Sequence, residues 1–121
     1  MEITLAGEII ESAGSPFDGM VMDFSEVKAI ATKNLIDVWD HAFLAWRRDE
    51  LVVRFLSSIP GHKTVLMDVV PTAENLAIVA FRILEPLYRD RYRNHLELER
   101  VRLFETPNCW ADAVRGEIPT N

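Results

Sequence analysis

Asp40 and His41 are the neighbouring pair whose side chains are best suited to move a proton. A carboxylate next to an imidazole can orient the ring and raise its basicity, which is what general acid–base catalysis requires. An adjacent Asp–His pair can equally serve at the surface or cap a helix. The pair is therefore a candidate for proton transfer, with a structural role as the alternative.

Glu105 is a second candidate, because the surrounding pattern puts its carboxylate among apolar side chains. In the strand predicted around it, Val101 and Leu103 share a face with Glu105. A carboxylate on such a face needs a partner. That partner is either a nearby arginine, Arg102 or Arg115, or a ligand with paired N–H donors.

The remaining polar residues of chemical interest give weaker signals. A predicted helix start gathers Thr72, Glu74 and Asn75, where capping is the simpler function and substrate contact the more specific one. The three histidines are far apart in the sequence, so none has the close spacing typical of zinc ligands on one element. Cys109 follows a turn without a neighbouring base, which favours an inert thiol. We therefore expect no metal site built from this chain alone.

The composition is that of a single globular domain, residues 1–121, with 49% hydrophobic and 26% charged residues. The apolar runs are far shorter than a bilayer span, and no basic flank precedes an apolar stretch at the N-terminus. We therefore expect neither a membrane segment nor a signal peptide. A net charge of −6 disfavours nucleic acid as a partner. Together with the single cysteine, these features indicate a cytoplasmic protein.

Hydrophobic periodicity predicts an α+β fold, an antiparallel sheet with two helices on one face. Asp23 and Glu26 form an Asx version of the capping box at the start of the first long helix. Pro86 should end or kink the second long helix. The predicted elements, in chain order, are a strand at 2–10, a helix from Asp23, a short helix at 49–58, a strand at 64–70, a helix from Thr72, and strands at 98–105 and 110–114.

Four segments of the sequence can be compared with known families as a set. They are Gly19-Met20-Val21-Met22-Asp23-Phe24-Ser25-Glu26-Val27-Lys28, Trp39-Asp40-His41-Ala42-Phe43-Leu44, Pro71-Thr72-Ala73-Glu74-Asn75-Leu76-Ala77 and Phe104-Glu105-Thr106. Taken together and in this order, they resemble the 6-pyruvoyl-tetrahydropterin synthase and 6-carboxy-tetrahydropterin synthase (QueD-like) family. The resemblance extends from about residue 2 to residue 114, nearly the whole chain, so chance agreement explains it poorly.

The resemblance implies the tunnelling fold (T-fold), in which antiparallel sheets from several subunits close into an oligomeric barrel with helices outside. It also implies a homohexamer of two stacked trimers, with active sites between subunits. By the same resemblance Glu105 is the pterin anchor, Thr72 and Thr106 line the pterin pocket, and Asp40 and His41 orient and move the proton. The implied substrate is 7,8-dihydroneopterin triphosphate or a related pterin.

The family's cofactor is a zinc ion, which acidifies the hydroxyls of the substrate side chain before triphosphate is eliminated. In the family three histidines hold the zinc, two of them in a His-Gly-His motif, and a cysteine just before that motif abstracts a proton. These ligands are not found in this sequence: Met1-Glu2-Ile3-Thr4-Leu5 aligns with a strand that lies beyond them, and Cys109 lies at the other end. Either the sequence begins inside a longer product that carries the ligands, or it is a shortened paralogue without zinc chemistry.

Three functions follow as competing hypotheses. The leading one is a 6-pyruvoyl/6-carboxy-tetrahydropterin synthase-like protein that binds the pterin and eliminates triphosphate if zinc ligands are supplied. The alternative is a non-catalytic pterin- or purine-binding oligomer that has lost the zinc chemistry. A third is a structural assembly protein that retains only the barrel.

Overall fold

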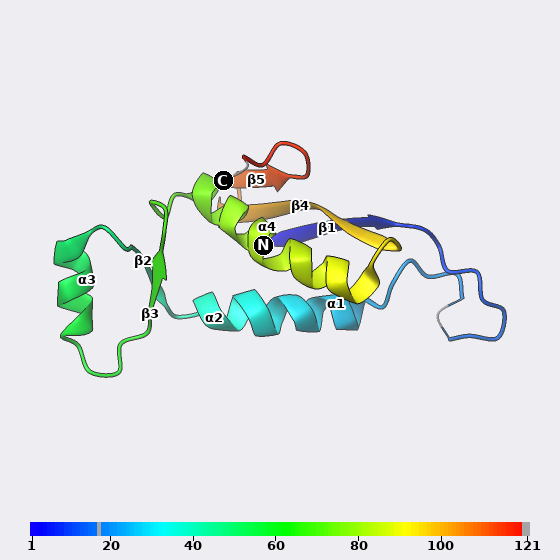
Figure 1. Ribbon diagram of the computed structural model, residues 1–121, viewed down its shortest axis with the longest axis horizontal. Coiled ribbons are helices and arrows are strands. Elements are labelled where there is room, and N and C mark those ends of the chain that lie inside the picture. The colour runs from blue at the N-terminus through cyan, green and yellow to red at the C-terminus, as the bar shows by residue number, and fades with distance from the viewer. Residues whose placement is uncertain (17, 120–121) are drawn as a thin grey trace.

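The computed structural model describes residues 1–16 and 18–119. Its elements are β1 (Glu2–Gly7), α1 (Phe24–Ala31), the π-helical η1 (Thr32–Ile36), α2 (Asp37–Trp39), β2 (Phe43–Trp46), α3 (Glu50–Ser57), β3 (Thr64–Met67), α4 (Ala73–Tyr92), β4 (Leu96–Thr106) and β5 (Cys109–Val114) (Figure 1). This order confirms the α+β pattern that the sequence predicts. Within the described ranges, no helix combines the length and the apolar character needed to cross a bilayer.

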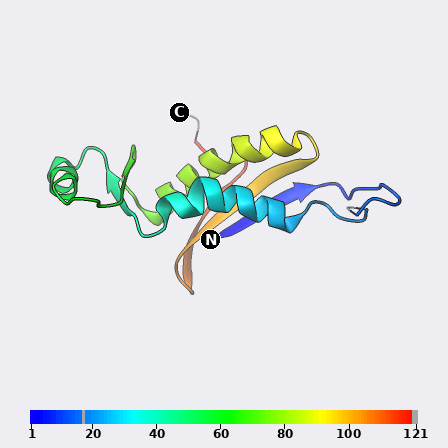
Figure 2. The same cartoon turned by 90° about the horizontal axis from the view of Figure 1, so that it is seen from below.

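The main sheet is antiparallel, with β4 between β1 and β5. α4 packs against β4 and β5, and the continuous helical segment α1–η1–α2 lies beside α4 (Figures 1 and 2). Side chains from both helical segments meet those of β4 and β5 in one hydrophobic core. Its largest fully buried members are Leu35, Leu84, Tyr88, Leu96, Leu98 and Val101.

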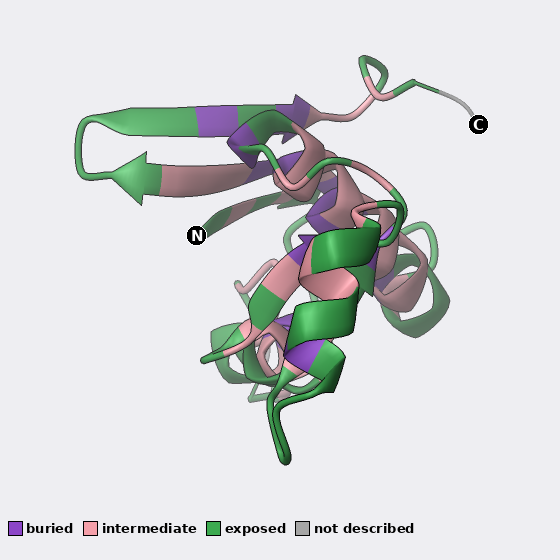
Figure 3. Ribbon diagram, turned by 90° about the vertical axis from the view of Figure 1, so that its left-hand side faces the viewer, coloured by how far each residue is buried: buried purple, intermediate pink, exposed green. Residues whose placement is uncertain are grey.

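Tyr88 connects the two helical segments inside this core. Its hydroxyl donates a 2.9 Å hydrogen bond to the carbonyl oxygen of Val27 in α1. Burial raises the pKa of Tyr88 to about 12, because a phenolate would lose its solvation here. Buried residues are concentrated where the helices and the sheet meet, whereas the end of the β4–β5 hairpin is exposed (Figure 3).

Residues 43–67 form a unit, here called the arm, that extends away from the main sheet (Figure 1). In the arm β2 and β3 pair in parallel, and α3 connects them. Ala45, Leu56 and Met67 form its small buried interior. The short helix predicted at 49–58 is thus confirmed as α3.

The strand predicted at 64–70 is too long, because β3 ends at Met67. It also does not join the antiparallel sheet. It pairs instead with β2, a strand that the sequence analysis did not identify. Four residues of β2 are too few to give a clear alternating pattern, and parallel pairing leaves no hairpin turn as a signal.

β1 is shorter than the strand predicted at 2–10, because it ends at Gly7. Gly7 approaches β4 so closely that an added Cβ would collide with the carbonyl oxygen of His95. Beyond it, the Ile10 N–H donates to the Met20 carbonyl at 2.7 Å, and the Ile10 carbonyl accepts from the Gly19 N–H at 2.8 Å. The chain leaves the sheet because its backbone groups now pair within their own loop.

Asp23 is the N-cap of α1, as predicted, but the reciprocal capping box with Glu26 is not formed. The Asp23 carboxylate accepts hydrogen bonds from the hydroxyl (2.7 Å) and the backbone N–H (2.9 Å) of Ser25. These bonds lower the pKa of Asp23, because they favour its charged form. The Glu26 carboxylate pairs instead with Arg91 near the end of α4.

α4 begins after the predicted N-cap, Thr72, but Pro86 does not end it. The helix continues through Pro86 to Tyr92. Proline removes one backbone N–H donor from the helix and crowds the preceding turn. Leu84 and Tyr88 on either side are fully buried in the core, so tertiary packing outweighs the local preference for a break.

Candidate functional site

Asp40 and His41 lie in the turn between α2 and β2. Nδ1 of His41 is 2.9 Å from Oδ2 of Asp40. This contact orients the imidazole and leaves the opposite nitrogen, Nε2, to exchange a proton with a bound group. The side chains of Asp40 and His41 are 63% and 90% exposed. The geometry required of an acid–base pair is therefore present on the surface of this chain.

The turn itself has the pattern of a type II β-turn. The Ala42 N–H donates to the Trp39 carbonyl at 3.1 Å. Asp40 has φ −63° and ψ 128°, and His41 has φ 55°. Glycine normally occupies the His41 position of such a turn, because other L residues disfavour positive φ. The His41 imidazole is therefore carried by a strained backbone position. Residues with strained backbone conformations are concentrated at functional sites.

Lys63, directly before β3, contacts the same turn from the arm. Its ammonium donates hydrogen bonds to the carbonyl oxygens of Asp37 (2.7 Å) and Asp40 (2.6 Å). Asp37 opens the three-residue α2 and Asp40 directly follows it. Both carbonyls therefore lie at the C-terminal end of the continuous helical segment α1–η1–α2, where helical carbonyls lack a partner and the helix dipole is negative. Lys63 therefore stabilises the end of the helix from which the turn departs.

Glu105 is the extra residue of a β-bulge near the end of β4. Phe104 pairs with Trp110 and Thr106 with Cys109, which leaves Glu105 without a paired residue on β5. The side chain is exposed, and no hydrogen bond or ion pair from another described residue engages its carboxylate. The expected burial of Glu105 on an apolar face is therefore wrong, because the bulge interrupts the alternation of the strand.

Arg102, one of the two arginines expected to pair with Glu105, binds Asp112 instead. Two hydrogen bonds of 2.7 and 2.9 Å connect this guanidinium to the carboxylate across the β4–β5 pair. They lower the pKa of Asp112, because they favour its charged form. The guanidinium also lies over the Trp110 ring, 4.6 Å from its centroid.

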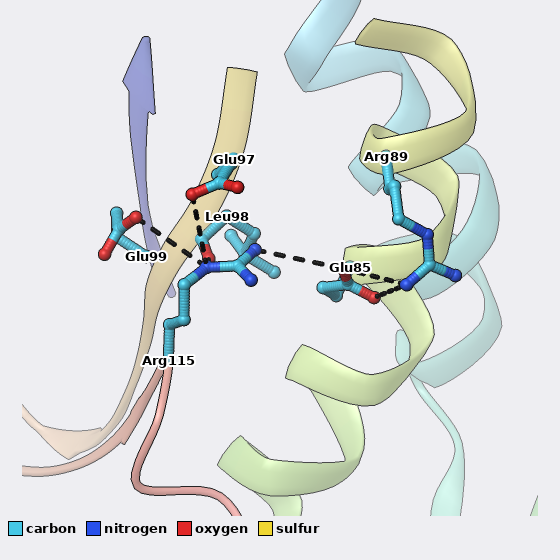
Figure 4. A network of polar contacts seen from close by, with 6 residues as sticks. All are labelled: Glu85, Arg89, Glu97, Leu98, Glu99 and Arg115. Carbon is cyan, nitrogen blue, oxygen red and sulfur yellow. Dashed lines mark hydrogen bonds and ion pairs between the residues drawn. The ribbon is translucent and has the colours of Figure 1, made fainter. Parts of the chain in front are cut away.

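Arg115, the other expected partner, directly follows β5 and lies at the end of the β4–β5 pair opposite to Glu105. It approaches Glu85 of α4 at 3.8 Å, and Glu99 and Glu97 of β4 at 3.7 and 4.0 Å (Figure 4). Arg89 pairs with the same Glu85 carboxylate at 3.0 Å. This network links α4 to the sheet, so the arginine pairing expected for Glu105 is wrong for both residues.

Thr72 and Thr106 each use the hydroxyl in a local backbone contact. Oγ1 of Thr72 accepts from the Asn75 N–H at 3.2 Å, which confirms the capping interpretation. Oγ1 of Thr106 accepts from the Asn108 N–H at 3.3 Å. Both threonines are exposed, and a hydroxyl that accepts one hydrogen bond still has its own proton to donate.

The predicted site residues thus lie on three segments: the turn with Asp40 and His41, the start of α4 with Thr72, and the hairpin end with Glu105 and Thr106. Across the described chain, no hydrogen bond or ion pair connects residues of one segment to those of another. All of these side chains are exposed. The chain presents its candidate groups on open surface.

Among residues 1–16 and 18–119, no three His, Cys, Asp or Glu side chains are grouped so that they could hold a metal ion. Nδ1 of His62 lies 2.6 Å from the Thr64 hydroxyl, and Nε2 of His95 lies 2.5 Å from the Val21 carbonyl oxygen. The donor set of the described residues therefore does not fit the zinc ion that the resemblance implies.

Comparison with known proteins settles the family. A family model described as 6-pyruvoyl tetrahydropterin synthase matches residues 1–116. The chain belongs to this family. The resemblance based on four short segments is confirmed.

Curated relatives carry a related name, 6-carboxy-5,6,7,8-tetrahydropterin synthase. The one from Rickettsia bellii is 28% identical over 113 residues, which cover 93% of this chain and 76% of the relative. The one from Rickettsia felis is 30% identical over 95 residues, 78% of this chain and 67% of the relative. The one from Haemophilus influenzae is 27% identical over 115 residues, which cover 93% of this chain and 75% of the relative. These similarities support a synthase-like function of the same family.

Two features of the site were missed from the sequence: the bulge at Glu105 and the contact of Lys63 with the Asp40 turn. Lys63 contacts backbone carbonyls, which any residue type supplies, so its partners leave no signature in the sequence. The available signal for the role of Lys63 was its position in the sequence, directly before the apolar run of β3. For the bulge, the Pro107-Asn108 turn marked the hairpin but not the register of the residues before it.

Proposed function

We propose that this chain is a pterin-binding subunit of the 6-pyruvoyl/6-carboxy-tetrahydropterin synthase type, with 7,8-dihydroneopterin triphosphate or a close relative as its ligand. The observation that carries the proposal is the Glu105 carboxylate, exposed at a bulge and not engaged by any described residue. A carboxylate offers two acceptor oxygens, which suit the paired N–H donors of a pterin ring edge. The bulge aims this side chain away from the regular strand.

In this proposal Asp40 and His41 move the proton. Asp40 holds Nδ1 of the ring, so the neutral imidazole presents Nε2 as a base. Thr72 and Thr106 line the pocket, because each hydroxyl retains a proton for a ligand oxygen or nitrogen. The steps assigned to this chain are the binding of the pterin and the transfer of one proton.

The proposed assembly is the family's barrel, a homohexamer in which neighbouring subunits complete each site. β1 and β5 are the outer strands of the sheet, and their free backbone edges favour pairing with other strands. The exposure of all the candidate side chains also supports a site completed by a second subunit. We place the protein in the cytoplasm on the sequence features given above.

The test is pterin binding by the Glu105→Gln variant, measured by calorimetry with 7,8-dihydroneopterin triphosphate. We expect the dissociation constant to rise roughly 10- to 100-fold, because the variant loses a charge-assisted pair of hydrogen bonds. Glu97→Gln is the matched control, since it removes a carboxylate from the other end of β4; its binding should equal that of the unchanged protein. Absence of saturable binding by the unchanged protein would contradict the proposal.

Release of inorganic triphosphate, assayed with zinc supplied, separates the two binding hypotheses. Turnover that depends on Asp40 and His41 supports a synthase. Saturable binding without turnover favours the non-catalytic pterin- or purine-binding oligomer.

A further inference from the structure

We propose that Lys63 is the positioning residue for Asp40 and His41, and that the arm serves to bring Lys63 to their turn. The functional part of this inference rests on the proposed role of the pair in proton transfer. The structural part rests on the hydrogen bonds of the Lys63 ammonium alone.

The decisive contact is the 2.6 Å hydrogen bond from Nζ of Lys63 to the carbonyl oxygen of Asp40. Type I and type II turns differ by a flip of their central peptide, which here joins Asp40 to His41. The flip would turn the Asp40 carbonyl away and let His41 adopt an ordinary negative φ. By holding this carbonyl, Lys63 selects the type II form and with it the φ of 55° at His41.

A second hydrogen bond attaches Lys63 to the helix that precedes the turn. The same ammonium donates to the Asp37 carbonyl at 2.7 Å, in the last turn of the continuous helical segment α1–η1–α2. An ammonium has three donors, so one lysine can link the helix end to the turn peptide. Lys63 thereby fixes the turn relative to α2, whose neighbour η1 contributes Leu35 to the core.

The Asp–His contact cannot hold this geometry by itself. The two side chains are 63% and 90% exposed, and exposed ion pairs contribute little because water competes for both partners. The backbone conformation must therefore present the ring to the carboxylate. That conformation is the one Lys63 holds.

The arm explains how Lys63 reaches the turn. The Phe43 N–H donates to the Lys63 carbonyl at 3.0 Å, and β2 and β3 then continue in parallel with Phe43 opposite Thr64. β2 begins directly after the turn, so this register sets Lys63 beside it. A parallel partner requires a crossover, which α3 supplies.

The test compares the Lys63→Met and Lys63→Arg variants, with Lys33→Met as the control. Methionine removes the donors but keeps a long side chain, and arginine keeps charge and donors. Lys33 is an exposed lysine of η1, so its variant removes the same charge without touching the turn. The first readout is the tautomer of His41, measured by nitrogen NMR at a pH where the ring is neutral.

We expect the Nδ1–H tautomer to dominate in the unchanged protein, in Lys63→Arg and in Lys33→Met, because Asp40 accepts from Nδ1. In Lys63→Met the Nε2–H tautomer should gain population. With turnover as the second readout, kcat should fall about 10- to 100-fold in Lys63→Met with little change in KM, and Lys63→Arg should restore most of it.

An unchanged tautomer in a folded Lys63→Met variant overturns the inference, as does an unchanged kcat in a protein that turns over. If Lys63→Met fails to fold, Lys63→Gln, whose shorter side chain misses one of the two carbonyls, must show the same direction of change. If the unchanged protein shows no turnover but the tautomer responds to Lys63, the proposed proton transfer by Asp40 and His41 fails and the positioning role of Lys63 stands.

Discussion

His41 Nδ1 and Asp40 Oδ2 lie 2.9 Å apart in a turn where His41 has a φ of 55°. The pair is exposed, so its geometry comes from the backbone and not from burial. A strained backbone is maintained only where the surroundings determine it. Here the surroundings are the end of α2 and the lysine of the arm.

Replacement of His41 by glycine and by alanine measures this strain. We expect His41→Gly to be more stable than His41→Ala by about 1 kcal/mol, because glycine accepts positive φ and alanine does not. The measurement is the free energy of unfolding from urea titrations of both variants. Ala42→Gly, at a position without positive φ, should destabilise the protein by about 0.5–1 kcal/mol. Equal stability of the two His41 variants would argue against strain.

Removal of the Tyr88 hydroxyl tests the connection between α1 and α4. Tyr88→Phe should lower the free energy of unfolding by about 1–2 kcal/mol at neutral pH, because the Val27 carbonyl loses its 2.9 Å hydrogen bond inside the core. Thermal or urea unfolding of the two proteins at pH 7 gives the difference. A variant as stable as the unchanged protein would show that this bond contributes nothing net.

The same tyrosine predicts a loss of stability in alkali. Its pKa is raised to about 12 in the folded protein, against about 10 in an unfolded chain. A raised folded pKa stabilises the protein fully below pH 10, and the contribution disappears as the pH rises through 12. We expect the free energy of unfolding of the unchanged protein to fall by roughly 2–3 kcal/mol over this pH range, and that of Tyr88→Phe to fall by less. Parallel curves of unfolding free energy against pH for the two proteins would contradict the assignment.

Pro86 should reduce the stability of α4. Pro86→Ala restores a backbone N–H to the helix interior and removes a clash, so we expect the free energy of unfolding to rise by about 1–3 kcal/mol. Pro71→Ala is the control, since Pro71 lies before the N-cap and outside the helix. This variant should leave the free energy of unfolding unchanged or lower it by up to about 1 kcal/mol. If Pro86→Ala is the less stable variant, the proline has a packing role that outweighs the missing hydrogen bond.

The sequence by itself determined the features that depend on near neighbours in the chain. The starts of α1 and α4 follow from Asp23 and Thr72, whose side chains cap backbone N–H groups two and three residues away. The Asp40–His41 contact also joins adjacent residues. The family, too, was recognisable from four short segments taken in their order along the chain, and a family model matches residues 1–116.

Only the tertiary structure decided the features that depend on distant residues. α4 continues through Pro86 because Leu84 and Tyr88 are buried against other elements. Helix propensity describes only the local chain and carries no information about this burial. The exposure of Glu105 depends on a one-residue shift in the pairing of β4 with β5. Lys63 meets the Asp40 carbonyl only because β3 pairs in parallel with β2. The physical reason is common to all three: strand register and core packing bring together groups whose separation in sequence carries no periodic signal.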